Sequence, residues 1–488
     1  MSKQIINLNG VKMKKSIKKN YLYNLFYQLL IMVLPFITTP YVSRVLGANN
    51  IGIYSYTYSI VTFFISFGSL GISLYGQREI AFVQDDKKKY SKIFWEVLLL
   101  KTITLSISMI VYWITFVYGN NDYRIYYKIL TLELIANIID ISWFFQGLED
   151  FKKTVMRNTI VKILSIIAIF IFVKTKNDLI KYFVIYMLST LLGNASLWFY
   201  LPKYIAKVKI RELNIFKHLK PTIMLFIPQI AIQVYTLLDK TMIGTIISDK
   251  SEVGYYEQAQ KIVKTALTVI TSLGTVMMPR IANTYSNGDK TKVKEYMYKS
   301  FNFVFLLAFP LILGLISVSN SFVPVFFGDG YERTSQIIKI ISPIILFIGL
   351  SNVTGTQYLL PVKRQTEFTL SVVVGAIVNF IMNSILIPMF GALGASIGTV
   401  IAEFTVTSVQ IYFTRKDFEW KEILKMSVKY IVSSLIMFAV CVLFDKVIKS
   451  NSLSTILQII FGAISYFVCL LILKDKLVKE IVNKVVKR

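Results

Sequence analysis

Cysteine and histidine are nearly absent from this chain of 488 residues. It holds two cysteines, Cys441 and Cys469, and one histidine, His218. So few ligand and thiol side chains exclude a disulfide framework and argue against a cysteine-based metal site. His218 lies in a basic loop, where we expect a solvated side chain. The chain also lacks a P-loop and an HExxH motif. We therefore expect no enzyme activity, no catalytic residues and no bound cofactor.

Charge is also scarce. Charged residues make up 17% of the chain and hydrophobic residues 55%, whereas a soluble domain carries about 25% charged residues. The apolar residues fall in blocks of about 20, enough to cross a bilayer as helices. The sequence therefore predicts an all-α polytopic membrane protein of about 14 spans. These expected spans cover residues 21–46, 51–75, 93–118, 124–147, 155–173, 179–201, 222–246, 253–278, 299–319, 336–360, 367–387, 392–413, 424–445 and 452–473.

Acidic residues are half as numerous as basic ones, 27 against 54, which leaves a net charge of +27. The basic residues gather in alternate loops, for example at residues 87–92, 203–220 and 290–294, and the intervening loops hold few. This is the positive-inside pattern of a membrane protein rather than a nucleic-acid-binding surface. It predicts that both termini lie in the cytoplasm. The N-terminal stretch lacks the short apolar core and cleavage site of a signal peptide, so we interpret it as a basic tail.

Two stretches resemble each other about 200 residues apart. Residues 24–61 read NLFYQLLIMVLPFITTPYVSRVLGANNIGIYSYTYSIV, and residues 226–263 read FIPQIAIQVYTLLDKTMIGTIISDKSEVGYYEQAQKIV. GIYSYTYSIV at 52–61 aligns with GYYEQAQKIV at 254–263. An internal repeat of this kind predicts two pseudo-symmetric lobes around a central cavity, with the substrate site where the repeats meet.

The repeat and the loops divide the chain into six expected parts. The linker and the C-terminal tail both alternate apolar residues with lysines, which is typical of amphipathic helices on the inner membrane surface; an ordinary solvated loop is the alternative for the linker. The parts are a cytoplasmic basic tail (1–20), an N-lobe of six spans (21–201), a cytoplasmic amphipathic linker (202–221), a C-lobe of six spans (222–413), two further spans (414–473) and a cytoplasmic amphipathic basic tail (474–488).

Ionisable residues within spans are costly, so they are the candidate functional residues. Glu257, Lys261 and Lys264 have the spacing of one helical face in the eighth span. They predict a cationic wall with an acidic spot, in which Lys264 remains for an anionic substrate. The alternative is an internal Glu257–Lys261 pair with Lys264 reaching towards the interface.

Other polar residues give weaker signals. Glu133, Asn137 and Asp140 share the same spacing in the fourth span, where Glu133 and Asp140 are candidates for coupling to a proton or sodium gradient; Asp140 at the cytoplasmic rim is the alternative. Three further residues, Arg44, Asp239 and Lys240, are candidates for a gate near the outer ends of their spans or for interfacial anchors. Asp239 is also a coupling candidate, and Arg44 and Lys240 are candidates for substrate binding. Asn379 and Asn383 share a face and could bind sugar hydroxyls or link helices.

Three stretches resemble the oligosaccharide flippases of the polysaccharide transporter family, the Wzx-type proteins. They read LPFITTPYVSRVLGANNIGIYSYTYSIV at 34–61, GQREIA at 76–81 and DISWFFQGLEDFKKTVMRN at 140–158. The family belongs to the superfamily that also contains multidrug extruders and lipid II flippases. The resemblance extends over nearly the whole chain and implies fourteen spans in two lobes.

The resemblance also implies a function. Such proteins move undecaprenyl-diphosphate-linked oligosaccharide repeat units from the inner to the outer leaflet of the bacterial cytoplasmic membrane by alternating access, for capsule, exopolysaccharide or O-antigen synthesis. Partners would then be this lipid-linked substrate, membrane lipids and other polysaccharide assembly proteins, but no nucleic acid. A multidrug or cation antiporter, a lipid II flippase and a membrane polysaccharide polymerase or glycosyltransferase are the alternatives. Short outer loops argue against the polymerase, and the cationic stripe argues against a carrier of cationic drugs.

Overall fold

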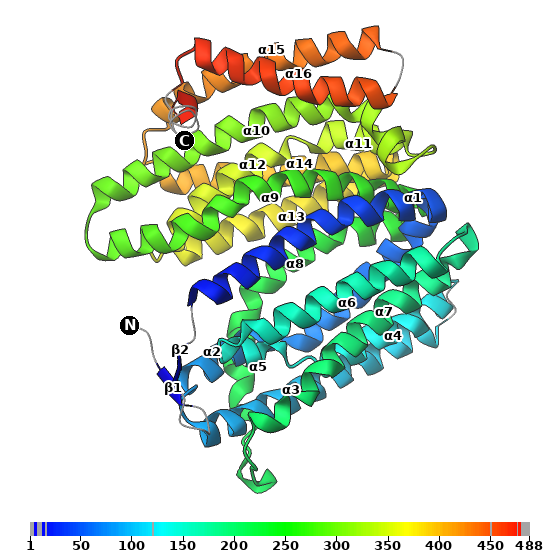
Figure 1. The fold of residues 1–488 in the computed structure, drawn as a ribbon, viewed down its shortest axis with the longest axis vertical. Helices are drawn as coiled ribbons and strands as arrows, with labels where there is room; N and C mark the ends of the chain where they lie inside the picture. The colour runs from blue at the N-terminus through cyan, green and yellow to red at the C-terminus, as the bar shows by residue number, and fades with distance from the viewer. Residues whose placement is uncertain are drawn as a thin grey trace. The chain divides into compact units, whose positions relative to one another are not determined.

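The structure is a computed structural model of the chain. It describes residues 4–6, 12–14, 17–119, 122–448, 451–475 and 477–479. Short strands β1 (Gln4–Ile6) and β2 (Lys12–Lys14) pair antiparallel in the N-terminal tail, with Ile5 opposite Met13. The rest of the described chain is helical or lies in connecting turns, so the all-α prediction is confirmed (Figure 1).

The chain divides into two compact units. Unit 1 contains residues 1–46 and 57–230, and unit 2 contains residues 47–56 and 231–488. Two helices therefore pass from one unit to the other, α1 (Ile17–Ser69) and α8 (Leu219–Ile246).

Six further helices belong to unit 1. Their apolar residues build a core of stacked and edge-to-face rings, with Phe94 and Trp143 centroids 5.6 Å apart. The helices are α2 (Ile72–Phe82), α3 (Lys87–Tyr112), α4 (Arg124–Ile138), α5 (Ser142–Gly147), α6 (Phe151–Phe172) and α7 (Leu179–Ser196). One π-helical turn, Trp113–Val117, extends α3.

Unit 2 is a bundle in which α13 packs along α14, and α15 and α16 pack on each other and on α10 (Figure 1). Gly391, at φ 61°, forms the sharp turn from α13 to α14, a backbone conformation that favours glycine. The helices are α9 (Ser251–Ser286), α10 (Lys290–Phe327), α11 (Glu332–Ile341), α12 (Ile344–Ser351), α13 (Gln365–Phe390), α14 (Ala392–Thr414), α15 (Trp420–Val447) and α16 (Asn451–Ile472), with a π-helix at Asn352–Leu359.

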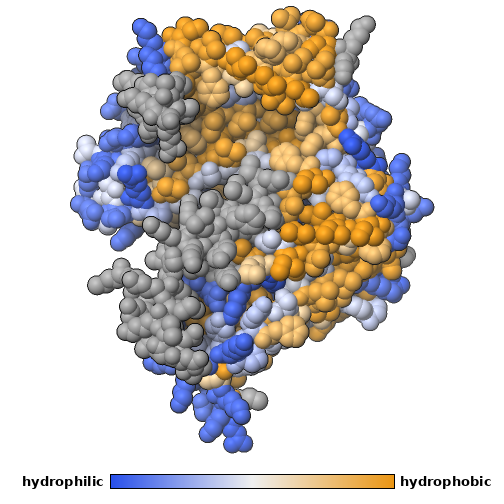
Figure 2. Space-filling model, in the orientation of Figure 1, coloured by the Kyte–Doolittle hydropathy of each residue, from blue (hydrophilic) through white to orange (hydrophobic). Residues whose placement is uncertain are grey.

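Within the described residues, twelve helical segments are long and apolar enough to cross a membrane. The first of these, Leu34–Phe82, is 49 residues long and contains the second half of the first expected span and the whole of the second. Gly47, at φ 75° and ψ 168°, interrupts α1 between them. The expected seventh span corresponds to α8, so fourteen spans are compatible with this structure. Apolar side chains face outward along the helices, for example on α15 and α16 (Figure 2), where Leu443 and Ile464 are 62% and 52% exposed. Exposed side chains of this kind fit a protein surrounded by lipid.

The two halves of the sequence repeat meet at a pair of glycines inside unit 2. A Cβ on Gly52 would lie 1.7 Å from the carbonyl oxygen of Lys250, and a Cβ on Gly254 would lie 2.1 Å from that of Ala48. Each glycine thus packs against the backbone four residues before the other. This reciprocal contact is what a local two-fold relation between matching segments produces. Glycine is required here because only a missing side chain lets helix backbones approach this closely.

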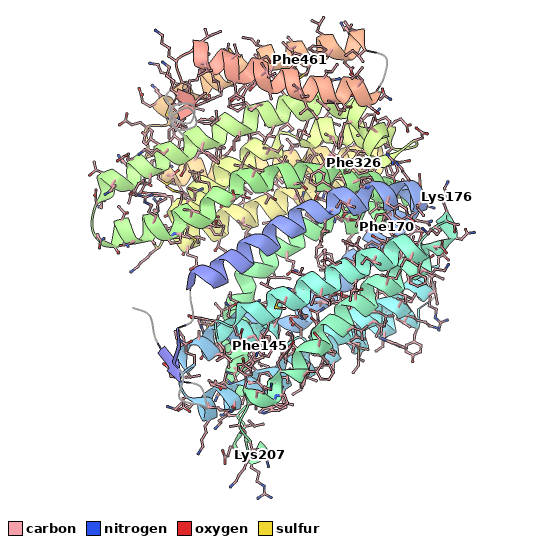
Figure 3. All side chains as sticks on the ribbon, in the orientation of Figure 1. Phe145, Phe170, Lys176, Lys207, Phe326 and Phe461 are labelled. Carbon is pink, nitrogen blue, oxygen red and sulfur yellow. The ribbon has the colours of Figure 1, made fainter. Side chains whose placement is uncertain are left out.

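The predicted linker lies within unit 1 and is not the expected amphipathic helix. From Leu201 to His218 it forms three short 3₁₀ turns, Leu201–Lys203, Ile210–Glu212 and Phe216–His218, joined by irregular chain. Its apolar residues Ile205 and Ile215 pack on the aromatic core of unit 1 instead of facing a membrane surface. Lysines such as Lys207 project away from unit 1 (Figure 3). Most of the C-terminal tail lies outside the described residues.

Candidate functional site

A cluster of charged side chains lies in unit 2 where α8 faces α9. The Lys240 ammonium of α8 forms a close ion pair with Glu257 of α9, and the Lys261 Nζ lies 3.8 Å from the same carboxylate. Glu257 and Lys240 are 14% and 19% exposed, so their pair is largely shielded from water. An ion pair in such a setting needs both partners, since removing one leaves an uncompensated buried charge.

Lys264 follows Lys261 by one turn and is exposed. It forms no ion pair with any residue that the structure describes, although the charges of Lys240, Glu257, Asp239 and Glu403 act on it electrostatically. The spacing correctly indicated that Glu257 would pair with a lysine and that Lys264 would remain. It missed that Lys240, from another helix, is the closer partner of Glu257. The gate role expected for Lys240 stays a prediction, with Glu257 as its ion-pair partner. Arg44 belongs to unit 1, where its side chain is exposed.

Asp239 precedes Lys240 but points into the unit, where it is 2% exposed. Its carboxylate accepts hydrogen bonds from Asn379 Nδ2 at 3.1 Å, Asn383 Nδ2 at 2.6 Å and Thr399 Oγ1 at 2.9 Å, and from the Tyr256 hydroxyl. Helices α8, α9, α13 and α14 thus converge on one buried carboxylate. Hydrogen bonds to neutral groups offset the cost of burying it without neutralising its charge.

Further oxygen atoms line the same network. Gln260 Nε2 donates to the Tyr256 hydroxyl at 2.6 Å. Two buried oxygens, Gln260 Oε1 and Asn383 Oδ1, have no hydrogen bond with the described residues. Buried acceptors with no donor are costly. A carboxylate beside amide and hydroxyl oxygens is a suitable environment for a proton or a monovalent cation such as sodium. Asn379 and Asn383 are fully buried against Asp239, which favours their alternative role of linking helices over sugar binding.

The polar stripe predicted for the fourth span does not lie on one continuous helix, because α4 ends at Ile138 and α5 begins at Ser142. Asp140 lies in the break. It accepts hydrogen bonds from the Ser142 amide at 2.9 Å and the Ser142 hydroxyl at 3.0 Å, and Lys101 Nζ lies 4.0 Å away. Asp140 thus hydrogen bonds with the first residue of α5 and lies beside the buried Lys101. Its role in coupling stays a prediction.

Three side chains bond the carbonyl groups that the break leaves free. Asn194 Nδ2 donates to the Ala136 carbonyl at 2.7 Å, Trp198 Nε1 to Ile139 at 2.7 Å and Lys101 Nζ to Asp140 at 3.0 Å. A broken helix at membrane depth is tolerated only where its backbone groups find such partners. The break itself could not be predicted, since no proline or glycine marks it.

Glu133, on α4, is 6% exposed and hydrogen bonds with Thr190 and Tyr58. Glu133 stays a candidate for proton coupling, and it lies on α4 itself, whereas Asp140 lies in the break after that helix. In the part of the chain that the structure describes, no group of three or more histidine, cysteine, aspartate or glutamate side chains could hold a metal ion.

The solvated position expected for His218 is wrong. His218 is 3% exposed, with Nδ1 2.7 Å from the Tyr75 hydroxyl and Nε2 2.9 Å from Glu96 Oε2. Lys217 Nζ, at 2.7 Å, also binds Glu96. Through these contacts the linker packs against α2 at Tyr75 and against α3 at Glu96. The signal in the sequence was Glu96, a carboxylate near the start of an apolar span, because such a group requires a partner.

The fold and these buried charges define a multi-span membrane transport protein. The family model described as polysaccharide biosynthesis protein matches residues 17–285, more than half of the chain, and a second model, MatE, matches residues 225–385. The chain therefore belongs to the polysaccharide biosynthesis protein family, which confirms the resemblance noted in the sequence.

Individual proteins agree with this assignment. A candidate O-antigen transporter of Escherichia coli (strain K12) is 27% identical over 83% of this chain and 98% of its own length. One of Shigella dysenteriae is 23% identical over 76% and 93%. A solved structure of the lipid II flippase MurJ, inward closed, superposes with a TM-score of 0.76 at 19% identity, covering 94% of this chain and 100% of that one. At this identity, the last likeness shows the fold. All three are transporters, in agreement with the expectation that the chain is not an enzyme.

Proposed function

We propose that this protein is a flippase for lipid-linked oligosaccharides, carrying undecaprenyl-diphosphate-linked repeat units from the inner to the outer leaflet. The observation that carries the proposal is Lys264, a cation within a membrane span with no ion-pair partner among the described residues. A lysine near the centre of a membrane span costs about 2.5 to 3.5 kcal/mol on insertion scales, so an anionic partner or water should accompany Lys264. The diphosphate of a lipid-linked sugar is such a partner.

The names of the relatives support the same substrate class, since they refer to O-antigen transport and lipid II. A role in O-antigen, capsule or exopolysaccharide export follows, with other assembly proteins of the pathway as partners. Movement would occur by alternating access, with the lipid tail kept in the bilayer while the headgroup crosses. Both termini would lie in the cytoplasm.

Charge balance suggests how an ion gradient would couple to this movement. Asp239, Glu257 and Glu403 offset Lys240, Lys261 and Lys264 in formal charge. A proton or sodium ion on Asp239 would leave the cluster with a net positive charge and so favour an anionic headgroup. By linkage, the headgroup would favour ion binding to the same extent. Asp239→Asn should make export independent of the coupling ion, and an unchanged ion dependence would assign coupling elsewhere, with Glu133 next.

A multidrug or cation antiporter is the second candidate, favoured by the MatE match over residues 225–385. The test that separates the two uses a bacterial strain whose surface polysaccharide depends on this protein. Loss of the protein should abolish surface polysaccharide and accumulate the lipid-linked precursor inside, while efflux of cationic dyes stays unchanged. Normal polysaccharide with impaired dye efflux would instead establish the antiporter.

A further inference from the structure

A polar cavity of about 210 Å³ lies between α6 and α7 in unit 1. Successive turns of the two helices line the cavity. The lining residues include Arg157 and Lys162 but no aspartate or glutamate. One water needs about 10 to 15 Å³ of such volume, so the cavity has room for a group of several heavy atoms. It is roomy enough for a phosphate group and has the charge to attract one.

Arg157 is held in place at the wall. Its Nη1 donates to Asn194 Oδ1 at 2.7 Å and to the Gly193 carbonyl at 3.4 Å, and its Nη2 donates to Asn158 Oδ1. Asn194 is itself fixed by its bond to the Ala136 carbonyl of α4. These three acceptors are neutral, and they fix the orientation of the guanidinium.

Lys162 is the deeper of the two cations. It lies nine residues into the Lys153–Phe172 span, or about 14 Å at 1.5 Å per residue, close to the middle of a hydrocarbon core about 30 Å thick. It is half-buried and forms no ion pair with the described residues. An uncompensated lysine at this depth calls for an anion or water.

One carboxylate, that of Glu133, lies next to the wall of the cavity. Thr190, on the wall, hydrogen bonds with Glu133, which does not itself line the cavity. The lining itself therefore carries cations and no carboxylate. Ser189, also on the wall, makes no hydrogen bond with the described residues and is available to donate one.

We propose that this cavity binds the phosphate of a membrane lipid, as a site of unit 1 separate from the charged cluster of unit 2. A guanidinium held in place beside a lysine ammonium supplies the two kinds of cation that proteins use to bind phosphate oxygens. The position of the cavity between two spanning helices makes the bilayer the source of the ligand. The proposal does not depend on the flippase function, because any phosphate-bearing lipid would satisfy it.

The test is native mass spectrometry of the full-length protein in nonionic detergent, with ligand pairs that differ only in phosphate. The pairs are phosphatidic acid against diacylglycerol, and undecaprenyl diphosphate against undecaprenol. The wild-type protein should retain the phosphate-bearing member of a pair at least about tenfold better, the lower range for a charge-assisted hydrogen bond. Retention of the undecaprenyl diphosphate alone that depends on Lys162 would identify the carrier lipid as the source, and Lys162-dependent retention of both would indicate a general lipid-phosphate site.

Variants locate the binding. Lys162→Met should reduce retention about tenfold, while Lys181→Met, which removes an exposed lysine of α7 that pairs with Asp178, should leave it unchanged. Lys162→Arg keeps the charge and should bind, which guards against misfolding of the first variant. Glu133→Gln removes the nearby carboxylate and should strengthen retention. Equal retention by the wild type and a folded Lys162→Met protein would overturn the proposal.

Discussion

Lys264 differs from the other two lysines of its cluster, because Lys240 and Lys261 both approach Glu257 and Lys264 does not. Lys264→Ala should therefore fold normally, since no ion pair is broken, but should export at least about tenfold less polysaccharide, a loss of about 1.4 kcal/mol of substrate interaction. Lys264→Arg should retain part of the activity. Export from a strain that relies on each variant, at matched protein levels, is the measurement.

The matched control is Lys299→Ala, which removes an exposed lysine paired with Glu295 on α10. It should leave export unchanged. Full export by Lys264→Ala would show that the diphosphate is held elsewhere, and Lys261 and Arg44 would be tested next.

At this scale, the sequence predicted which helix carries the charged stripe but not which groups complete it. Spacing along one helix identifies i, i+4 neighbours, so it found Lys261 beside Glu257. Contacts between helices, such as Lys240 to Glu257 or Asn383 to Asp239, depend on helix packing. Spacing along one helix does not predict them. Asp140 and Lys101 show the same limit, since 39 positions separate them in the chain.

At the scale of elements, the contact between Gly52 and Gly254 sets how closely α1 and α9 approach. A methyl group on Gly52 would overlap a backbone carbonyl at 1.7 Å, which no side-chain movement can relieve. Gly52→Ala should therefore destabilise the protein by about 1 to 3 kcal/mol, the usual cost of overpacking. The measurement is the midpoint of thermal unfolding in detergent.

A glycine whose added methyl group would make only an ordinary van der Waals contact serves as the comparison. Gly314→Ala adds a methyl group that meets only Met437 Cε, at 3.7 Å, and should leave the midpoint unchanged. If Gly52→Ala unfolds at the same temperature as Gly314→Ala, the close crossing does not exist.

The linker is a second element whose chemistry can be tested. Burial lowers the pKa of the His218 imidazole below its ordinary value of 6.5, an effect that Lys217 strengthens and Glu96 only partly offsets. The folded protein then holds this proton less tightly than the unfolded chain, so stability is complete above pH 6.5 and decreases as the pH falls below it. The unfolding midpoint should drop between pH 7.5 and 5.5, and less so in His218→Gln. An identical drop in both proteins would place the sensitivity at other groups.

The linker also shows why periodicity alone misled. Its apolar residues recur at roughly helical spacing, which favours an amphipathic helix. Those residues instead pack on the aromatic core of unit 1, and the buried Glu96 accepts a hydrogen bond from the Asn214 amide at 2.7 Å. Tertiary contacts thus fix an irregular conformation that the sequence pattern does not reveal.

At the scale of the whole molecule, the basic loops predict the orientation in the membrane. The two ends of α10 make a test, in a protein whose Cys441 and Cys469 are replaced by serine. Asp329→Cys should react in intact cells with a maleimide that cannot cross the membrane, and Lys290→Cys should react only after lysis. Reaction of Lys290→Cys in intact cells would reverse the predicted topology.

Most of the fold could be predicted because membrane helices are set by length and hydrophobicity. The apolar blocks predicted the positions of the helices to within several residues. The sequence match between the Gly52 and Gly254 segments corresponds to segments that are in contact in the structure. The break in the fourth span escaped prediction, because the side chains that satisfy it come from α3, α7 and the turn that follows α7.

The most direct test of the central claim is headgroup movement in proteoliposomes. The purified protein is reconstituted with a fluorescent undecaprenyl-diphosphate oligosaccharide, and a reductant that cannot cross the bilayer quenches only the outward-facing sugars. The flippase account predicts that wild-type protein exposes the inner pool to quenching, and that Lys264→Ala does so at least about tenfold more slowly. No movement with the wild-type protein, or equal rates for both proteins, would contradict it.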